Sequence, residues 1–128
     1  MIAGGGSPTG IDRLKKRTAF LAAAKGRTYA TAGVVVQARD RSDDGPARVG
    51  FTVTKKLGSA VVRNRIKRRL REAARLSLPG RARRGYDYVL IGRAAGLKRP
   101  FGGLQNDIAT ALKRLHPQPT SRADTELS

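Results

Sequence analysis

The sequence contains no cysteine, no tryptophan and only one histidine, His116. The absence of cysteine excludes disulfides, thiolate metal sites and cysteine nucleophiles. A single histidine excludes multi-histidine metal clusters, and histidine-based catalytic triads are not expected either. Most familiar enzyme chemistry is therefore excluded, and we expect neither catalytic residues nor a metal site on the protein itself.

Acidic residues are also scarce, since nine Asp and Glu accompany 27 Lys and Arg and give a formal charge of +18 in 128 residues. Repulsion between so many like charges destabilises a compact state, and a concentrated polyanion relieves it. Nineteen of the basic residues are Arg, whose planar guanidinium matches phosphate and stacks on bases. No segment pairs a basic face with the apolar face of an interfacial helix. The sequence therefore predicts a nucleic-acid partner and no membrane contact.

Long hydrophobic runs are missing as well. No stretch approaches the roughly 18 consecutive apolar residues of a membrane span, and residues 1–10 lack the apolar core of a secretory signal. Residues 1–10 and 117–128 are rich in residues typical of disordered tails. We therefore expect a cytoplasmic protein with one RNA-binding domain at residues 11–116.

Hydrophobic periodicity and turn signals predict six elements. These are a helix at 12–25, strands at 31–39 and 47–54, a helix at 59–76, a strand at 86–93 and a helix at 103–115. Ser59 is expected to cap the middle helix. In strand 47–54, Val49, Phe51 and Val53 alternate with small residues. The face with Val49, Phe51 and Val53 is expected to be buried, and the face with the small residues leaves room for another group to lie against it. This order predicts an α+β sandwich of one sheet with covering helices.

The helix expected at 59–76 has two opposite faces. Its core-facing stripe consists of Val62, Ile66, Leu70 and Ala73. The other side carries Asn64, Lys67, Arg68, Arg71 and Arg75, with Arg63 and Arg65 on its flanks. A solvated helix usually alternates its charges, whereas Lys67, Arg71 and Arg75 follow one another at intervals of four residues. This surplus predicts a face that binds a polyanion.

A family resemblance is carried by residues 50–75, which read GFTVTKKLGSAVVRNRIKRRLREAAR. A Lys-rich strand end, a Gly turn and then Arg-Asn-Arg followed by Lys-Arg on a helix resemble the protein subunit of bacterial ribonuclease P. The matching residues are Lys55, Lys56, Gly58, Arg63, Asn64, Arg65, Lys67 and Arg68. Further landmarks match in order from Arg13 to Leu115, so the resemblance covers most of the chain.

This resemblance implies the element order α-β-β-β-α-β-α, one mainly antiparallel sheet and a left-handed βαβ crossover, which departs from the usual right-handed rule. It implies that a catalytic RNA subunit hydrolyses the phosphodiester that releases the 5′ leader of precursor tRNA. The protein is then an accessory subunit of this endoribonuclease. The resemblance further implies Mg²⁺ held by the RNA subunit and substrate, and one protein monomer per RNA.

The resemblance also assigns two binding regions. The basic helix is expected to bind the RNA subunit through Arg63, Asn64, Arg65, Lys67, Arg68, Arg71 and Arg75. A cleft between the first helix and the sheet is expected to bind the single-stranded leader through Phe20, Lys16, Lys25, Lys55, Lys56 and Arg93. A leader of variable sequence requires a basic groove and a flat ring on which any base can stack. Ala24 and Gln37 stand where the family commonly has further aromatics, so charge is expected to matter more here.

Two other interpretations stay open at this point. The charge alone is compatible with a general RNA-binding or ribosomal protein that has no processing role. Asp40, Asp43 and Asp44 suggest an independent nuclease, but they lie in a Gly-Pro turn without metal-ligand spacing, and a solvated loop is expected. His116 is expected to interact with a helix dipole, and the three tyrosines are expected to be strand or core residues.

Overall fold

The structure is a computed structural model that describes residues 11–116. The tails expected at 1–10 and 117–128 lie outside the described residues. The elements are β1 (Ile11–Arg13), α1 (Arg17–Ala24), β2 (Arg27–Ala30), β3 (Val34–Asp40), β4 (Ala47–Thr52), the 3₁₀ turn η1 (Lys55–Leu57), α2 (Ala60–Ser77), β5 (Tyr86–Gly92), the 3₁₀ turn η2 (Ala94–Leu97) and α3 (Phe101–Leu115). None of the helices in the described part of the chain has the length and apolar character needed to cross a membrane.

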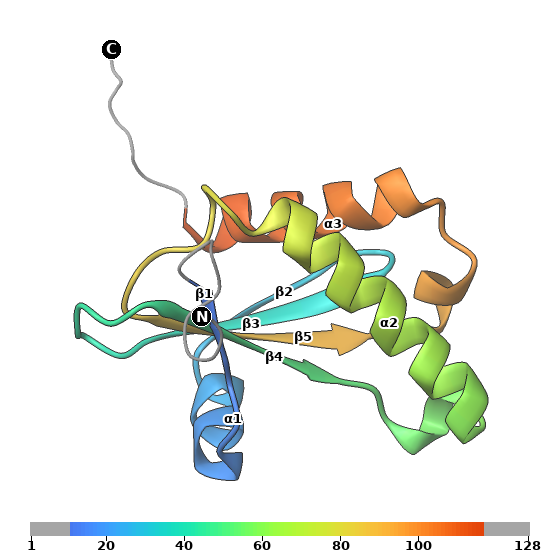
Figure 1. Ribbon diagram of the computed structural model, residues 1–128, viewed down its shortest axis with the longest axis horizontal. Helices are drawn as coiled ribbons and strands as arrows, with labels where there is room; N and C mark the ends of the chain where they lie inside the picture. Colours follow the sequence, from blue (N-terminus) through green and yellow to red (C-terminus); the bar gives the residue numbers. More distant parts are fainter. Residues whose placement is uncertain (1–10, 117–128) are drawn as a thin grey trace.

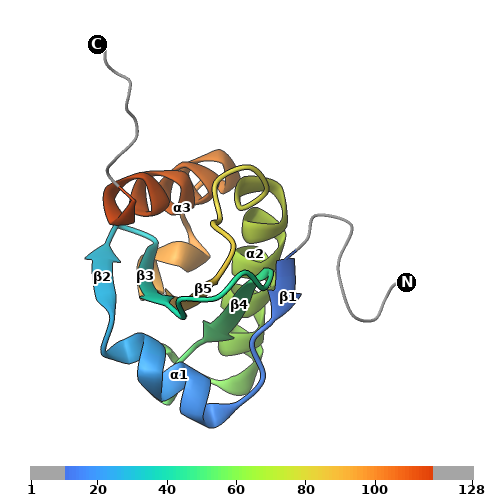
Figure 2. The same ribbon diagram turned by 90° about the vertical axis from the view of Figure 1, so that its left-hand side faces the viewer.

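The five strands form one sheet in the order β1-β4-β5-β3-β2, with α2 and α3 on one face and α1 on the other (Figures 1 and 2). This confirms the predicted α+β sandwich. The sheet is mixed rather than mainly antiparallel, because β4 pairs in parallel with both β1 and β5. Among the described strands, both antiparallel pairs involve β3, which lies between β2 and β5. Helix α2 is the crossover between β4 and β5, and its left hand stays a prediction of the resemblance.

The first helix begins later than the sequence indicates. Asp12 and Arg13, expected at the start of the helix, instead belong to β1, which pairs with β4. The Leu14 amide then donates to the Val49 carbonyl at 2.8 Å, and the helix starts only at Arg17. A three-residue strand is too short to show a periodicity of its own, which is why the pattern of apolar residues assigned it to the helix.

The strand expected at 31–39 proves to be the second strand of a hairpin. The Thr31 amide donates to the Val34 carbonyl at 2.8 Å and closes the turn between β2 and β3. In this turn the Gly33 amide donates to Asp107 of α3 at 3.1 Å. Arg99 also pairs with Asp107, at 2.9 Å between Nη2 and Oδ1. The hairpin is thereby fixed to the helix layer.

The main core lies between the sheet and the pair α2 and α3. The predicted stripe of α2 is confirmed, because Ile66, Leu70 and Ala73 are at most 1% exposed and Val62 packs against the same core. Ser59 caps the helix as predicted, with its side chain accepting from the Val62 amide at 3.3 Å. Helix α2 is therefore held by one apolar side, and its basic side faces outward.

The three tyrosines occupy strands, as predicted, and all pack in or against the main core. A smaller apolar cluster lies on the opposite face of the sheet, between α1 and the strands. Its buried residues are Leu14, Ala19, Ala23 and Val89. This second cluster holds α1 against the sheet and places Phe20 beside β4.

Candidate nucleic-acid interface

Four cations on the outward side of α2 have no partner within the described part of the chain. No hydrogen bond or ion pair joins Arg65, Lys67, Arg68 or Arg71 to another described residue. Asn64 lies on the same side and is exposed. The fold leaves these cations available, and phosphate is the anion that their number and spacing suit.

The other arginines of α2 are already engaged. Arg63 donates to the Gly58 carbonyl at 3.2 Å, and Arg75 pairs with Glu72 three residues before it. Arg69 donates through Nε to the Gly96 carbonyl at 3.0 Å and also to the Arg99 carbonyl. Arg69 thus holds the turn η2 against α2, and its role is structural.

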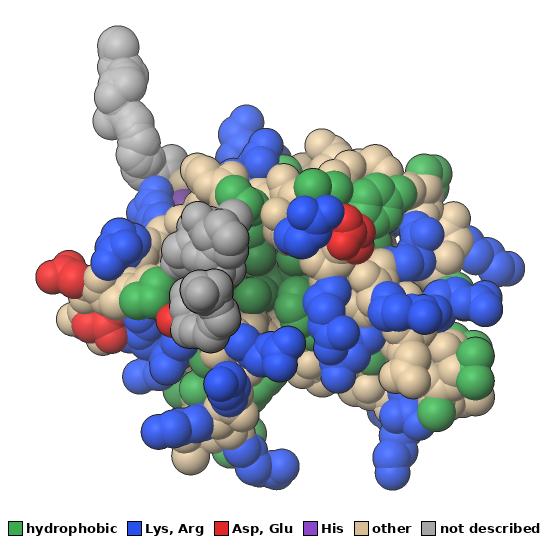
Figure 3. All heavy atoms as spheres, viewed as in Figure 1, with side chains coloured by type: hydrophobic (Ala, Val, Ile, Leu, Met, Phe, Trp, Pro, Cys, Tyr) green, Lys and Arg blue, Asp and Glu red, His purple; other side chains and the backbone are tan. Residues whose placement is uncertain are grey.

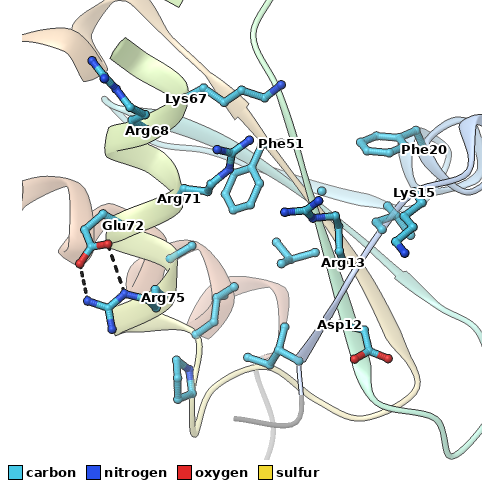
Figure 4. A pocket seen from close by; sticks show the side chains of 17 residues that line it. Asp12, Arg13, Lys15, Phe20, Phe51, Lys67, Arg68, Arg71, Glu72 and Arg75 are labelled. Atoms are coloured by element: carbon cyan, nitrogen blue, oxygen red, sulfur yellow. Dashed lines mark hydrogen bonds and ion pairs between the residues drawn. The ribbon is translucent and has the colours of Figure 1, made fainter. Parts of the chain in front are cut away.

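A groove of about 920 Å³ runs between α2 and β1, with β4 as its floor (Figure 4). The wall from α2 carries four of the predicted RNA-binding residues, namely Lys67, Arg68, Arg71 and Arg75. The opposite wall carries Arg13 and Lys15, which also have no hydrogen bond or ion pair with any described residue. Phe51 lies on the floor, and Phe20 lies at the end nearest α1. The groove is therefore apolar inside and basic along both sides.

Phe20 lies directly against the strand at Gly50. A Cβ at position 50 would be only 2.4 Å from Cζ of the Phe20 ring, so any other residue there would displace the ring. Beyond this contact, α1 no longer covers the sheet. Val35, Thr52 and Ile91 form one row on that face and are only half-buried. Phe20 thus borders both the groove and this uncovered part of the sheet, which we call the open sheet face.

The predicted leader-binding cations lie outside the groove. Lys55 and Lys56 follow β4, and Arg93 follows β5, so the parallel pairing of these strands brings all three to one edge of the sheet. Lys16 lies at the N-terminus of α1, where its carbonyl accepts from the Phe20 amide. Lys25 lies at the other end of α1 and is separated from this group. The structure therefore brings Lys55, Lys56 and Arg93 to one end of the sheet and places Lys16 and Lys25 at the two ends of α1.

Arg93 has a second interaction, because its guanidinium donates to the Thr31 carbonyl at 2.9 Å. This contact directs the side chain toward the hairpin of β2 and β3. Part of its hydrogen-bonding capacity is used there. The side chains of Lys16, Lys55 and Lys56 are exposed and have no partner among the described residues.

A second group of arginines surrounds a buried carboxylate. Asp87 is fully buried and accepts from Arg48 at 2.7 and 2.8 Å and from Arg41 at 2.7 Å. Burial alone would raise the pKa of Asp87, but the hydrogen bonds from Arg48 and Arg41 outweigh it and lower the pKa. These arginines join β3, β4 and β5 at the end of the sheet away from the α2 N-terminus.

The acidic turn is an exposed loop, as predicted, and hydrogen bonds within it hold its shape. Asp43 pairs with Arg41 at 2.9 Å and accepts from the Gly45 amide at 2.9 Å. Asp40 accepts from the Ser42 amide at 2.8 Å. The hydrogen bond from Arg41 is the main cause of a lowered pKa at Asp43. These carboxylates close the turn, and Asp43 and Asp44 are exposed.

The interpretation of His116 was wrong. Burial, followed by the nearby charges of Arg83 and Arg27, lowers the pKa of His116 to about 4. The ring is therefore neutral near pH 7, and a neutral ring adds no charge to a helix dipole. Its Nε2 atom forms a hydrogen bond with the Tyr88 hydroxyl at 2.6 Å. His116 closes the end of the core instead.

Comparison with known proteins identifies the family. A family model described as Ribonuclease P matches residues 10–116. The chain belongs to the ribonuclease P protein family. The Ribonuclease P protein component of Ruegeria pomeroyi is 55% identical over 116 residues, covering 87% of this chain and 92% of its own length. That of Caulobacter vibrioides is 54% identical over 103 residues, covering 80% and 69%.

Solved structures of the family have the same fold. The RNase P protein from Thermotoga maritima gives a TM-score of 0.67 at 30% identity and covers 80% of this chain and 96% of that one. The protein from Staphylococcus aureus gives 0.66 at 31%, with 80% and 93% covered. The chain is thus the protein component of ribonuclease P, an endoribonuclease that processes the 5′ end of tRNA, and its partner is the RNA subunit.

Sequence reasoning missed three residues of the groove. Phe51 was assigned to a buried face, and Arg13 and Lys15 lie within the stretch that carries the family resemblance but were given no role. The alternation in strand 47–54 does place Phe51 on the side of the basic helix, which is a usable signal. The position of Arg13 depends on β1, and the pattern of apolar residues did not reveal that strand.

Proposed function

We propose that the ribonuclease P protein binds the RNA subunit through the outward side of α2 and binds the 5′ leader of precursor tRNA on the open sheet face. The unpartnered cations Arg65, Lys67, Arg68 and Arg71 carry this proposal. Their repulsion destabilises the free protein, and contact with phosphates offsets it while releasing counterions from the RNA. One protein monomer binds each RNA subunit, and the complex acts in the cytoplasm.

Leader binding is supported by an aromatic ring and by exposed cations. Phe20 offers a flat surface beside β4, and stacking of one base on such a ring contributes about 1–3 kcal/mol regardless of base identity. Lys16 at the start of α1 and Lys55 and Lys56 after β4 are exposed and attract the phosphates. Binding of this kind tolerates leaders of any sequence. Holding the leader also positions the cleavage site relative to the RNA subunit, because the leader is joined directly to the cleavage site.

Mg²⁺ belongs to the RNA subunit and substrate in this proposal. When bound there, it supplies the charge stabilisation and activated water that phosphodiester hydrolysis requires. Among residues 11–116, no group of three or more His, Asp or Glu side chains could hold a metal ion. The proposed RNA-binding surfaces carry Lys and Arg, which repel a divalent cation. The protein's contribution is therefore to lower the repulsion between the RNA subunit and the precursor tRNA.

A cleavage assay tests the leader site. Precursor tRNAs with a long or a one-nucleotide leader are cleaved by the RNA subunit at low Mg²⁺, with wild-type protein or with Phe20→Leu. We expect Phe20→Leu to weaken binding of the long-leader substrate by roughly tenfold and to leave the short-leader substrate unchanged. Leu21→Ala is the matched control, because Leu21 is 53% exposed on the same helix.

The same assay separates this proposal from its alternatives. Equal losses for both substrates would remove Phe20 from the leader site. If the protein does not alter cleavage at low Mg²⁺, it is a general RNA-binding protein without a processing role. Cleavage by the protein without the RNA subunit would indicate an independent nuclease.

A further inference from the structure

The groove beside α2 has an apolar floor that phosphate binding alone does not explain. Val49, Phe51, Ala74 and Leu78 line it, between basic side chains on both walls. In the space-filling view, hydrophobic side chains gather in a hollow flanked by Lys and Arg (Figure 3). Its volume of about 920 Å³ is near the upper end of the range for small-molecule sites, roughly 300–1,000 Å³. The groove can therefore receive a flat apolar group together with an anion.

Phe51 lies where such a group would stack. It points from β4 toward α2 and is half-buried, and the guanidinium of Arg71 lies beside its ring (Figure 4). Arg13 reaches the same space from β1. Arg13 and Arg71 have no hydrogen bond or ion pair with any residue in the described part of the chain. An aromatic face and two unpartnered guanidinium groups therefore converge on one hollow.

We propose that this groove binds one unpaired nucleotide of the RNA subunit, with its base stacked on Phe51 and its phosphate held by Arg71 and Arg13. This inference rests on the proposed function, because it assumes that α2 faces the RNA subunit. An unpaired base offers an exposed flat face next to a phosphate, whereas a base pair in a duplex hides that face. Aromatic rings and guanidinium planes are the groups on which proteins stack such bases.

We assign the nucleotide to the RNA subunit because the groove is continuous with the face of α2 that is proposed to bind that RNA. Lys67 and Arg68 belong both to the predicted RNA-subunit-binding set and to the wall of the groove. A nucleotide in the groove is therefore adjacent to phosphates held by the outward side of α2. The leader site lies on the other face of the sheet, along the row of Thr52 and Ile91, and meets the groove only at Phe20.

The lack of tryptophan in the natural chain permits a direct optical test. Phe51→Trp keeps a flat ring in the groove and adds the one tryptophan of the 128-residue sequence, which can be excited apart from the three tyrosines. We expect the RNA subunit alone, without precursor tRNA, to quench this tryptophan and shield it from acrylamide. Tyr29→Trp is the matched control, because Tyr29 lies on β2 at the opposite edge of the sheet, and its emission should not change.

Affinity measurements distinguish stacking from charge. Phe51→Leu keeps the apolar packing but removes the ring, so binding of the RNA subunit should weaken by roughly tenfold with an unchanged salt dependence. Arg71→Gln should instead reduce the slope of log affinity against log salt by about 0.7–0.9. Arg71 is exposed, so this variant reports on the groove even if the variants at Phe51 do not fold.

Several results would overturn the inference. The proposal is wrong if the tryptophan of Phe51→Trp stays accessible in the complex, or if the salt slope of Arg71→Gln equals that of wild type. A tryptophan already shielded in the free protein would show that the chain's own residues fill the groove. Quenching only after precursor tRNA is added would assign the groove to the substrate.

The proposed function is tested separately in the same experiment. Lys67→Glu combined with Arg68→Glu should abolish assembly with the RNA subunit. If it does so while Phe51→Leu has no effect, only the groove proposal fails. If the double charge reversal binds normally, the assignment of α2 to the RNA subunit fails with it.

Discussion

Two groups of basic residues in this protein have opposite surroundings. Arg41 and Arg48 converge on the fully buried Asp87, with hydrogen bonds of 2.7 to 2.8 Å. Lys67, Arg68 and Arg71 on α2 contact no acid in the described part of the chain. The first group joins three strands of the sheet, and the second adds repulsion to the free protein. Residues of the same type thus stabilise the fold in one place and prepare it for an RNA partner in another.

The comparison shows that partners, and not residue type, decide what a cation does. An arginine beside a buried carboxylate makes strong charge-assisted hydrogen bonds within the fold. A row of cations four residues apart destabilises an isolated helix by a few tenths of a kcal/mol per pair. Such a row is expected where an external polyanion supplies the missing negative charge. The α2 group should therefore matter for binding and the Asp87 group for stability.

The largest expected effect comes from reversing charge on α2. Lys67→Glu with Arg68→Glu should weaken binding of the RNA subunit by roughly hundredfold or more, because two charge-assisted contacts are lost. The melting temperature should not fall, since repulsion within α2 decreases. Lys113→Glu with Arg114→Glu is the matched control, because both residues are exposed at the end of α3. Equal losses of affinity in the two double variants would mean that only net charge matters.

The next effect concerns the buried carboxylate. Asp87→Asn removes the buried anion of Arg48 and leaves Arg41 only its exposed partner Asp43, so the free energy of unfolding should fall by about 3 kcal/mol. Thermal denaturation should show a melting temperature roughly 10 °C lower or more. Affinity for the RNA subunit, measured well below that temperature, should be unchanged. A large loss of affinity with normal stability would contradict the division of roles.

Anions should separate the two groups further. Sulfate or phosphate relieves repulsion among unpartnered cations, so the melting temperature of the wild-type protein should rise by several degrees. The rise should be smaller in Lys67→Glu with Arg68→Glu, whose α2 face repels itself less. It should be unaltered in Asp87→Asn. A melting temperature that does not respond to these anions would show that the α2 cations cost little stability.

The smallest expected effect involves His116, which lies close to Arg27 and Arg83. Its folded-state pKa of about 4 is below the unfolded value of about 6.5. The unfolded chain therefore binds the proton first, and stability should fall as the pH falls from 6.5 toward 4. Melting temperatures between pH 7 and 4.5 should show this decline, and His116→Gln should flatten it. An identical decline in the variant would assign it to other groups.

Much of the fold follows from the sequence because it depends on local patterns. Three local patterns predict their own structure. These are the apolar stripe with Ile66 and Leu70, the Ser59 cap and the alternation in β4. Strand β1 does not, because three residues carry no period and it exists only through its pairing with β4. The local sequence of β4 also does not show which strands will lie beside it. Its parallel pairing with β1 and β5, which makes the sheet mixed, therefore could not be predicted from that pattern.

The binding residues divide in the same way. The helical period was enough to place Lys67 and Arg71 on the outward side of α2. It did not reveal that Arg69 bonds to carbonyls of η2, nor that Lys25 lies apart from Lys16, because these facts depend on how separate elements meet. The small residues of strand 47–54 predicted that another group lies against that face. They did not reveal that the group at Gly50 is the ring of Phe20.

The central claim is that the outward side of α2 lies against the RNA subunit. Because the natural chain has no cysteine, a single introduced thiol can carry an iron chelate that cleaves nearby RNA. With the chelate at Asn64→Cys on α2, the account predicts strong, localised cleavage of the RNA subunit, and with the chelate at Lys113→Cys on α3 it predicts little. Equal cleavage from both positions, or none from Asn64→Cys, would contradict it.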